Sequence, residues 1–321
     1  MGGYTSLVLR QPRLMRSVSR QKREVPHDAF VAFAWREPSL IRFTTEDGNP
    51  VVVAETKGYG IYLDNDSLID LATGDASRQK RFVDALHAKA TLLFSWANAI
   101  EVAGPQGASA EAVRGFLDRI GPHWIPLQLN PWEVVKREQA GLAAEAAVST
   151  KFMEAYFQRR AYDVGESSAV IDLTREAFFQ LGAVVDWVHE HRDKIRADAE
   201  AIDNELRALL EKRRADYEKN PASLDEFLPP CRFDERFPAT FVLVHLQRIL
   251  IKEAKEYHFK RHDGLDLCHA TIAAAYGSVI TLDKEWKRRV EALPAPHNLA
   301  RTYYRPEINQ LVATLEALSV P

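Results

Sequence analysis

The chain has 321 residues, of which 46% are hydrophobic and 27% charged, so it is long enough to bury one large core or two modest ones. Its two cysteines, Cys231 and Cys268, exclude a disulfide framework and offer no thiolate spacing for zinc, which favours a reducing cytoplasm. The formal net charge of −3 gives no general attraction for nucleic acid, so RNA binding would need a local basic surface.

Residues 1–29 form a basic N-terminal segment, in which six arginines and lysines precede the first acidic residue. An Arg-rich, acid-poor start fits an ordinary basic segment, an arm for nucleic acid, or a targeting signal. The opening MGGYTS also matches the short N-myristoylation pattern. No apolar run in the sequence approaches the ~18 residues of a membrane span, so we expect none.

Residues 30–142 are predicted to alternate strands and helices. IRFTT and VVVAE flank a DGNP turn, which indicates a hairpin. Buried strands are then expected at IYLD, TLLFS and HWIPLQL. Helices are expected over 78–90, after Ser95 as an N-cap, over 109–119, and from Pro131. This order favours an α/β fold with a parallel sheet flanked by helices.

Between 143 and 258 helical patterns replace the strands. Apolar residues at alternating steps of four and three predict an amphipathic helix or a helical hairpin, and they are Ile195, Ala199, Ile202, Leu206 and Leu209. NPASLDEFLPP is expected to be a loop, and TFVLVHLQRILIKEAKEYHF an apolar helix. We therefore predict a large all-helical insertion over 143–258.

Strand and helix signals return after the insertion. DLCHATIAAAYG and KEWKRRVEAL are predicted helices on either side of a strand at SVITLD. We expect residues 30–142 and 259–295 to form one α/β domain. The remaining segment, 296–321, is predicted to be a C-terminal helix with Pro306 in its first turn.

Four acidic residues end these apolar runs or lie in the short helices beside them. Asp64 and Asp283 each close a predicted strand, whereas Glu101 and Asp266 lie in predicted helices. The carboxyl ends of parallel strands meet at the edge where open α/β sheets bind ligands. Carboxylates gathered there repel each other unless a cation joins them. Oxygen ligands favour Mg²⁺ or Mn²⁺ over zinc, and we interpret the set as a phosphodiester-cleaving site.

The segments that carry these acids resemble the PIN-domain nucleases, a family of metal-dependent ribonucleases, over about 61–142 and 262–292. IYLDNDSL, LLFSWANAIE, IPLQLNPWEVVKREQAG, DLCHATIAAAYG and VITLDKEW are similar to the family's segments in the same order. The resemblance implies a PIN-like fold in which Asp64, Asp266 and Asp283 hold one or two divalent ions. Glu101 would be a ligand or would orient the attacking water.

The chain also departs from the family pattern. Asp66 stands where the family usually has Asn, Ser or Thr, and the helical insertion is far longer than usual. We expect Asn65, Asp66 and Asp263 to support the ligands, although Asp263 also suits the N-cap of a helix over 264–276. A groove for RNA phosphates is predicted from the basic residues Lys260, Arg261, Lys284, Lys287 and Arg288.

The leading hypothesis is a cytoplasmic Mg²⁺- or Mn²⁺-dependent endoribonuclease, acting as a toxin or in RNA processing or defence. Its insertion would gate RNA, form a homodimer or dock a protein inhibitor. A catalytically inactive PIN-like scaffold is the first alternative. LDNDSL is also similar to the first motif of haloacid dehalogenase-type phosphatases, in which Asp64 would be the nucleophile, but Glu101 and Asp266 would then have no role.

Overall fold

A computed structural model describes residues 6–10, 41–46, 49–55, 58–104, 107–121, 123–142, 146–149, 181–253 and 257–319. For the first three ranges it describes the backbone alone. The predicted basic segment, 1–29, lies outside the described residues apart from strand β1 (Ser6–Arg10). The part of the insertion over 150–180 also lies outside them.

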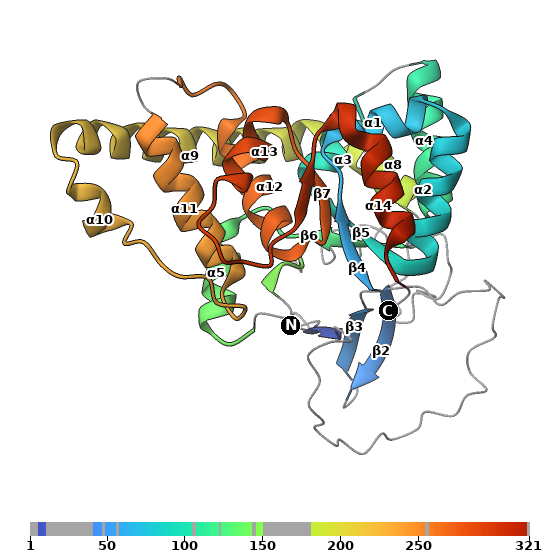
Figure 1. The fold of residues 1–321 in the computed structure, drawn as a ribbon. Helices are drawn as coiled ribbons and strands as arrows, with labels where there is room; N and C mark the ends of the chain where they lie inside the picture. Colours follow the sequence, from blue (N-terminus) through green and yellow to red (C-terminus); the bar gives the residue numbers. More distant parts are fainter. Residues whose placement is uncertain are drawn as a thin grey trace.

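The fold is α/β and is built on a five-stranded parallel sheet in the order β6-β5-β4-β7-β8 (Figure 1). Its strands are β4 (Tyr59–Tyr62), β5 (Ala90–Ser95), β6 (Trp124–Leu127), β7 (Val279–Thr281) and β8 (Arg301–Tyr303). The chain builds from β4 through β5 to β6 and then returns to the other side of β4 as β7. The carboxyl ends of β4 and β7 therefore meet at a topological switch point, the place where open α/β sheets bind ligands.

Helices cover both faces of this sheet because right-handed crossovers in the two directions place their helices on opposite faces (Figure 1). One group packs around α2, and it comprises α1 (Asn65–Thr73), α2 (Ala76–Lys89), α4 (Ala108–Ile120) and α14 (Ile308–Ala317). The other packs around α12, and it comprises α5 (Pro131–Gln139), α11 (Pro238–Lys252), α12 (Asp263–Tyr276) and α13 (Lys284–Glu291).

Local sequence signals explain where several of these helices begin. The side chains of Asp64, Asp75, Ser95, Asn130 and Asp283 each accept a backbone N–H at the start of α1, α2, α3 (Trp96–Val102), α5 and α13. A capping side chain of this kind stabilises a helix by about 1 kcal/mol. Every residue of β5, β6 and β7 is buried, as expected for strands covered on both faces.

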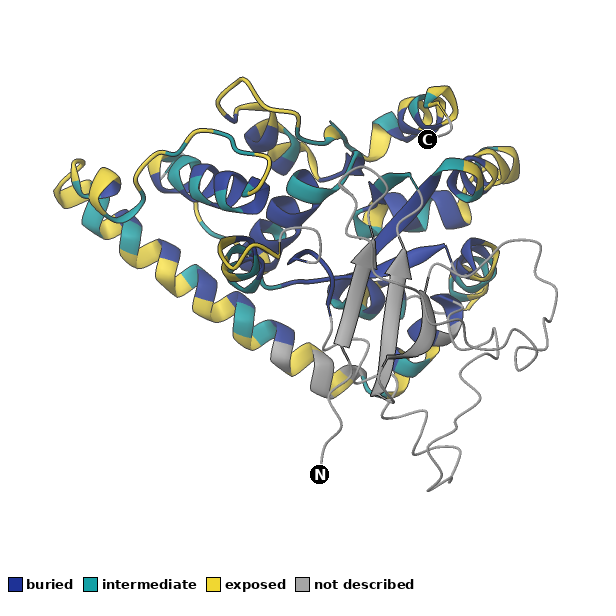
Figure 2. Ribbon diagram, turned by 90° about the horizontal axis from the view of Figure 1, so that it is seen from below, coloured by how far each residue is buried: buried dark blue, intermediate teal, exposed yellow. Residues whose placement is uncertain are grey.

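The core joins the sheet to the helices of the predicted insertion. Val184 of α8 (Leu181–Glu190) and Leu246 of α11 belong to the same buried cluster as Leu92 of β5 and Leu311 of α14. Figure 2 shows the buried residues concentrated in the strands and on the inward faces of the helices. These helices are therefore integral to the packing that holds the sheet.

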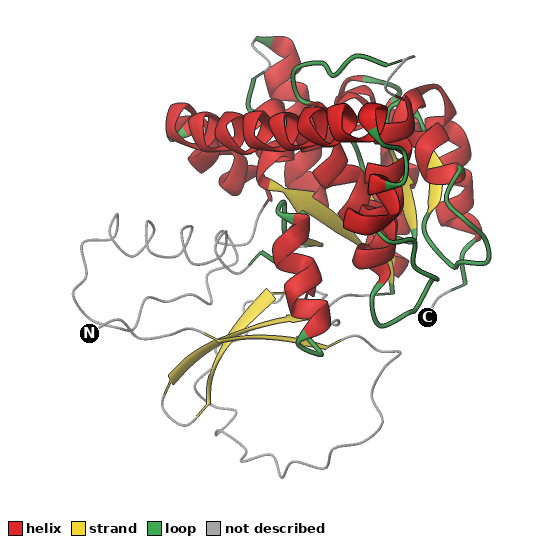
Figure 3. Cartoon of the chain, turned by 90° about the vertical axis from the view of Figure 1, so that its left-hand side faces the viewer, coloured by secondary structure: helices red, strands yellow, loops and turns green. Residues whose placement is uncertain are grey.

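The longest helix, α9 (Arg192–Lys219), runs across the helical layer as the long horizontal ribbon of Figure 3. It packs against α3, α11 and α12. Ala199 and Leu206 form a small buried cluster with Ala97 of α3 and Leu265 of α12. α9 therefore lies directly beside the helices that carry Glu101 and Asp266.

The predicted hairpin forms, with β2 (Ile41–Glu46) antiparallel to β3 (Asn49–Glu55). It belongs, however, to a separate three-stranded sheet in which the unpredicted β1 pairs with β3, and not to the sheet that carries Asp64. The predicted C-terminal helix, with Pro306 in its first turn, forms as the 3₁₀ helix η4 (Arg305–Glu307) followed by α14, but the unpredicted strand β8 precedes it within 296–321.

Three further details differ from what the sequence predicted, and they concern α10, α1 and Leu209. NPASLDEFLPP contains the short helix α10 (Ser223–Phe227), and helix α1 after Asp64 was not expected. The segment 192–219 is one continuous helix, which is the first of the two alternatives predicted for it. Leu209 is exposed and Leu210 is buried. The inward face of α9 runs through Ala199, Asp203, Leu206, Leu210 and Arg214, so two of its positions are polar and were not recognised in the apolar pattern. In the described ranges, no helix has the length and apolar character that crossing a membrane requires.

Candidate functional site

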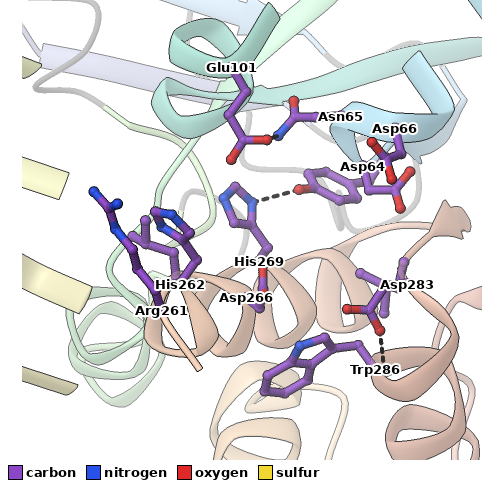
Figure 4. Close-up of a pocket in the computed structure, with 13 residues that line it drawn as sticks. Asp64, Asn65, Asp66, Glu101, Arg261, His262, Asp266, His269, Asp283 and Trp286 are labelled. Carbon is purple, nitrogen blue, oxygen red and sulfur yellow. Dashed lines mark hydrogen bonds between the residues drawn. The ribbon is translucent and has the colours of Figure 1, made fainter. Parts of the chain in front are cut away.

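A pocket of about 320 Å³ lies at the switch point between the ends of β4 and β7. All four predicted acids, Asp64, Glu101, Asp266 and Asp283, line it (Figure 4). Asp64 and Asp283 follow β4 and β7, and Glu101 and Asp266 lie in α3 and α12, so the fold brings together residues more than 200 positions apart. The other lining residues are Tyr62, Asn65, Asp66, Arg261, His262, Leu265, His269, Leu282 and Trp286.

Asp64 is held rigidly at the end of β4. Its Oδ1 accepts hydrogen bonds from the backbone N–H of Ser67 at 3.0 Å and from the Thr281 hydroxyl at 2.9 Å. It is therefore an N-cap and a pocket residue at once. Burial raises the pKa of the Asp64 carboxyl, although its bonds to Ser67 and Thr281 oppose the shift.

Glu101 is positioned by a chain of two asparagines. The Asn65 side chain donates to Glu101 Oε2 at 2.5 Å, and the Asn98 side chain donates to Asn65 Oδ1 at 3.1 Å. Asn98 is buried and fixed in turn, because its Oδ1 accepts from the backbone and hydroxyl of Ser95. Desolvation and the charges of Asp66 and Asp64 raise the pKa of the Glu101 carboxyl, whose side chain keeps an exposed surface.

Asp266 carries the largest perturbation among the four acids. Burial raises the pKa of its carboxyl to about 8, with further contributions from the charges of Asp283, Asp263 and Glu101. Hydrogen bonding by the Trp286 side chain opposes this shift. Burial and neighbouring carboxylates both shift the pKa of a carboxyl group in this direction.

Asp283 caps α13, since its Oδ1 accepts from the backbone N–H of Trp286 at 2.8 Å. Its side chain is exposed on the pocket rim (Figure 4). The capping and lining roles do not exclude each other, because a carboxylate that gives one lone pair to a cap retains others for a ligand.

Asp263 does not cap α12, so that expectation is wrong. The N-cap is His262, in a left-handed conformation with φ of 79°, and the buried Asp263 accepts instead from the Tyr257 hydroxyl at 2.7 Å. The first backbone N–H groups of α12 donate to Asp203 of α9, with 2.9 Å from Gly264 and 3.3 Å from Leu265. Asp263 does not line the pocket but acts on it through the charge it places near Asp266.

The predicted basic groove is reduced to one residue at the pocket. Arg261 lines it and forms an ion pair with Glu200 of α9 at 2.5 Å. Lys287 instead pairs with Glu307 and Arg288 with Glu253. Lys260 and Lys284 are exposed and lie outside the lining residues. This part of the site prediction is therefore not supported beyond Arg261.

Among the lining residues that the sequence analysis did not name are Tyr62 and His269. The Tyr62 hydroxyl and His269 Nδ1 are 2.6 Å apart, and both side chains are buried. A signal for them existed. Tyr62 lies two positions before Asp64, and His269 three positions after Asp266, so strand and helix periodicity place them near those acids.

In the described part of the chain, no three His, Cys, Asp or Glu side chains stand close enough to form a ready metal-binding group. The four acids line the pocket wall, where Asp64 and Glu101 are engaged by hydrogen-bond donors. The chemistry of the set still fits a hard divalent cation, because its donors are carboxylate oxygens, and burial together with the neighbouring carboxylates raises the pKa of Asp266.

Comparison with known proteins identified no similar family model, curated protein or solved structure.

Proposed function

We propose that this pocket is the active site of a PIN-like, Mg²⁺- or Mn²⁺-dependent endoribonuclease. The observation that carries the proposal is the convergence of Asp64, Glu101, Asp266 and Asp283 on one pocket at the switch point of a parallel sheet. Switch points bind ligands, and a cluster of carboxylates with a strongly raised pKa is typical of a functional site.

The roles follow from the surroundings of each residue. Asp64, Asp266 and Asp283 would hold the ion, and Glu101, oriented by Asn65, would accept a hydrogen bond from the attacking water. The bound ion supplies charge for the phosphate oxygens and activates water in phosphodiester hydrolysis. Arg261 would contact a substrate phosphate at the pocket rim, where its guanidinium is exposed.

Water as nucleophile fits the lining better than an aspartyl-phosphate mechanism. A phosphatase with Asp64 as nucleophile needs a lysine beside it, and the described residues that line the pocket include none. Its Oδ1 is also engaged by Ser67 and Thr281. RNA as substrate, and a role in toxicity, processing or defence, rest on the resemblance of the acidic segments. The contact of α9 with α12 supports a gating or partner-binding role for the insertion.

The test is cleavage of a panel of single-stranded RNAs with Mg²⁺, Mn²⁺ or EDTA, using Asp64→Asn and Asp283→Asn. Asparagine is as good an N-cap as aspartate, so both variants should fold while losing a charged ligand. Asp75→Asn is the matched control, because Asp75 caps α2 and does not line the pocket.

We expect metal-dependent cleavage that falls at least ~100-fold in both pocket variants and is unchanged in the control. Mn²⁺ binding, measured by calorimetry, should weaken in the same two variants. No cleavage by the natural chain, together with no Mn²⁺ binding, would overturn the proposal in favour of a scaffold.

A further inference from the structure

His269 and Tyr62 form a buried pair in the wall of the acidic pocket. His269 is 8% exposed and Tyr62 2%, and the Tyr62 hydroxyl lies 2.6 Å from His269 Nδ1. The imidazole stands between Glu101 and Asp266, with its second nitrogen directed away from Tyr62 (Figure 4). The proposed hydrolysis assigns neither residue a role.

The partners of the Tyr62 hydroxyl decide which nitrogen of His269 carries the proton. Asn98 Nδ2 donates to this oxygen at 3.5 Å, so it provides no acceptor for the phenolic proton. Among the described residues, His269 Nδ1 is the acceptor within reach. Tyr62 therefore donates to Nδ1, and the neutral imidazole carries its proton on Nε2.

Both groups stay neutral near neutral pH. Burial lowers the pKa of His269 to about 4, and a phenol is ordinarily protonated at neutral pH. A charged lysine or arginine at this position would pair with the carboxylates and compete with a cation. A neutral N–H offers a hydrogen bond without neutralising them.

Among the described residues, the Nε2–H of His269 has no acceptor. In the part of the chain that the structure describes, no group hydrogen-bonds to Nε2. A donor in this position, surrounded by acids that would hold a cation, suits an anionic oxygen that enters the pocket with the cation. The non-bridging oxygens of a phosphodiester have this chemistry.

We propose that His269 Nε2–H binds a non-bridging phosphate oxygen of the substrate, that Tyr62 is the positioning residue that fixes its tautomer, and that His269 is not a metal ligand. For its ligand the inference rests on the proposed phosphodiester hydrolysis. The tautomer and the binding of phosphate can be measured without any cleavage.

The first experiment is ¹⁵N NMR of the His269 side chain in the full chain at neutral pH, before and after adding inorganic phosphate with Mg²⁺. We expect a protonated Nε2, an unprotonated Nδ1, and a shift of the Nε2–H resonance on adding phosphate. In Tyr62→Phe the two tautomers should become mixed. A proton on Nδ1, or an Nε2–H resonance that phosphate does not move, would overturn the proposal.

The second experiment compares His269→Leu with His269→Gln, whose amide N–H can reach the position of Nε2. We expect RNA cleavage to fall about 10- to 100-fold in the leucine variant and to recover largely in the glutamine variant, with Mn²⁺ affinity unchanged in both. Loss of Mn²⁺ affinity in step with cleavage would make His269 a ligand and overturn the proposal.

The two proposals fail in distinguishable ways. If the natural chain cleaves no RNA but phosphate moves the Nε2–H resonance, the ribonuclease fails and the phosphate site stands. If RNA is cleaved but His269 carries its proton on Nδ1, the further inference fails alone. A leucine variant that does not fold leaves the NMR measurement on the natural chain to decide.

Discussion

Asp64 and Thr281 are hydrogen-bonded to each other twice, although they lie 217 positions apart. The backbone N–H of Asp64 donates to the Thr281 hydroxyl at 2.8 Å, and that hydroxyl donates to Asp64 Oδ1 at 2.9 Å. Thr281 is fully buried at the end of β7. This reciprocal pair fastens the ends of β4 and β7 together at the point where the pocket forms.

Replacing Thr281 by valine keeps the side-chain shape and removes the hydroxyl. The Asp64 N–H then lacks its acceptor and the carboxylate lacks one donor, so we expect a loss of about 1–3 kcal/mol in the free energy of unfolding. The pKa of Asp64 should rise further, and RNA cleavage should fall. Urea unfolding and cleavage assays test this. Thr281→Ser keeps the hydroxyl and should retain both properties; equal losses in the two variants would contradict the argument.

Asp203 provides a cap from a distant helix. Its carboxylate accepts from the backbone N–H groups of Gly264 and Leu265, and a Cβ on Gly264 would lie 2.8 Å from the Asp203 carbonyl oxygen, so glycine allows the close approach. Asp203→Ala leaves these donors unpaired and should cost about 2–4 kcal/mol in unfolding free energy. Cleavage should also fall, because Asp266 lies in the same helical turn. Glu211→Ala, exposed on the same helix, is the control and should change neither urea unfolding nor cleavage.

Much of the central fold could be predicted because its signals are local. Buried strands are continuous apolar runs, and Asp64, Ser95 and Asp283 sit where strands end and helices begin. β8 could not be predicted, since it has three residues and carries an exposed arginine. The cap of α12 was assigned to Asp263 because it is the nearest suitable side chain, whereas the structure uses Asp203, sixty positions earlier.

The four acids could be predicted together because parallel strands deliver their ends to one edge. The direction of the basic side chains could not, because it depends on ion pairs between elements. Lys287 turns to Glu307 and Arg288 to Glu253, and neither partner is near in sequence. The pairing of His269 with Tyr62 could not be predicted either, because Tyr62 lies on a strand 207 positions away.

A variant of Glu138 tests the stability of the fold without changing the pocket. This buried carboxylate accepts from the backbone of Ala239 and Thr240 at the start of α11 and from the Tyr276 hydroxyl, and it does not line the pocket. Glu138→Gln replaces one acceptor oxygen by a donor, so we expect a loss of about 2–4 kcal/mol in stability. Cleavage per folded molecule, measured well below the unfolding temperature, should be unchanged. A fall in that specific activity would show that α11 is coupled to the pocket.

The raised pKa of Asp266 predicts how stability depends on pH. With a pKa of about 8 in the folded protein, the native state keeps a proton that the unfolded chain loses near pH 4. Stability should therefore fall as the pH rises from about 4 to about 8, by at most ~1.4 kcal/mol per pH unit, and the cost is complete above pH 8. Asp266→Asn removes this dependence, so the unfolding free energy of the variant should increase relative to that of the natural chain as the pH rises across this range.

A divalent cation should offset the stability that is lost when Asp266 ionises, because it favours the ionised carboxylate. Adding Mg²⁺ at pH 8 should stabilise the natural chain more than Asp266→Asn, and Mg²⁺ affinity should rise with pH up to about 8. Urea unfolding at pH 5, 7 and 9, with and without Mg²⁺, measures both effects, and Asp75→Asn serves as the control. Parallel curves of unfolding free energy against pH for the natural chain and Asp266→Asn would mean that Asp266 is ionised without a cation, which would contradict its raised pKa.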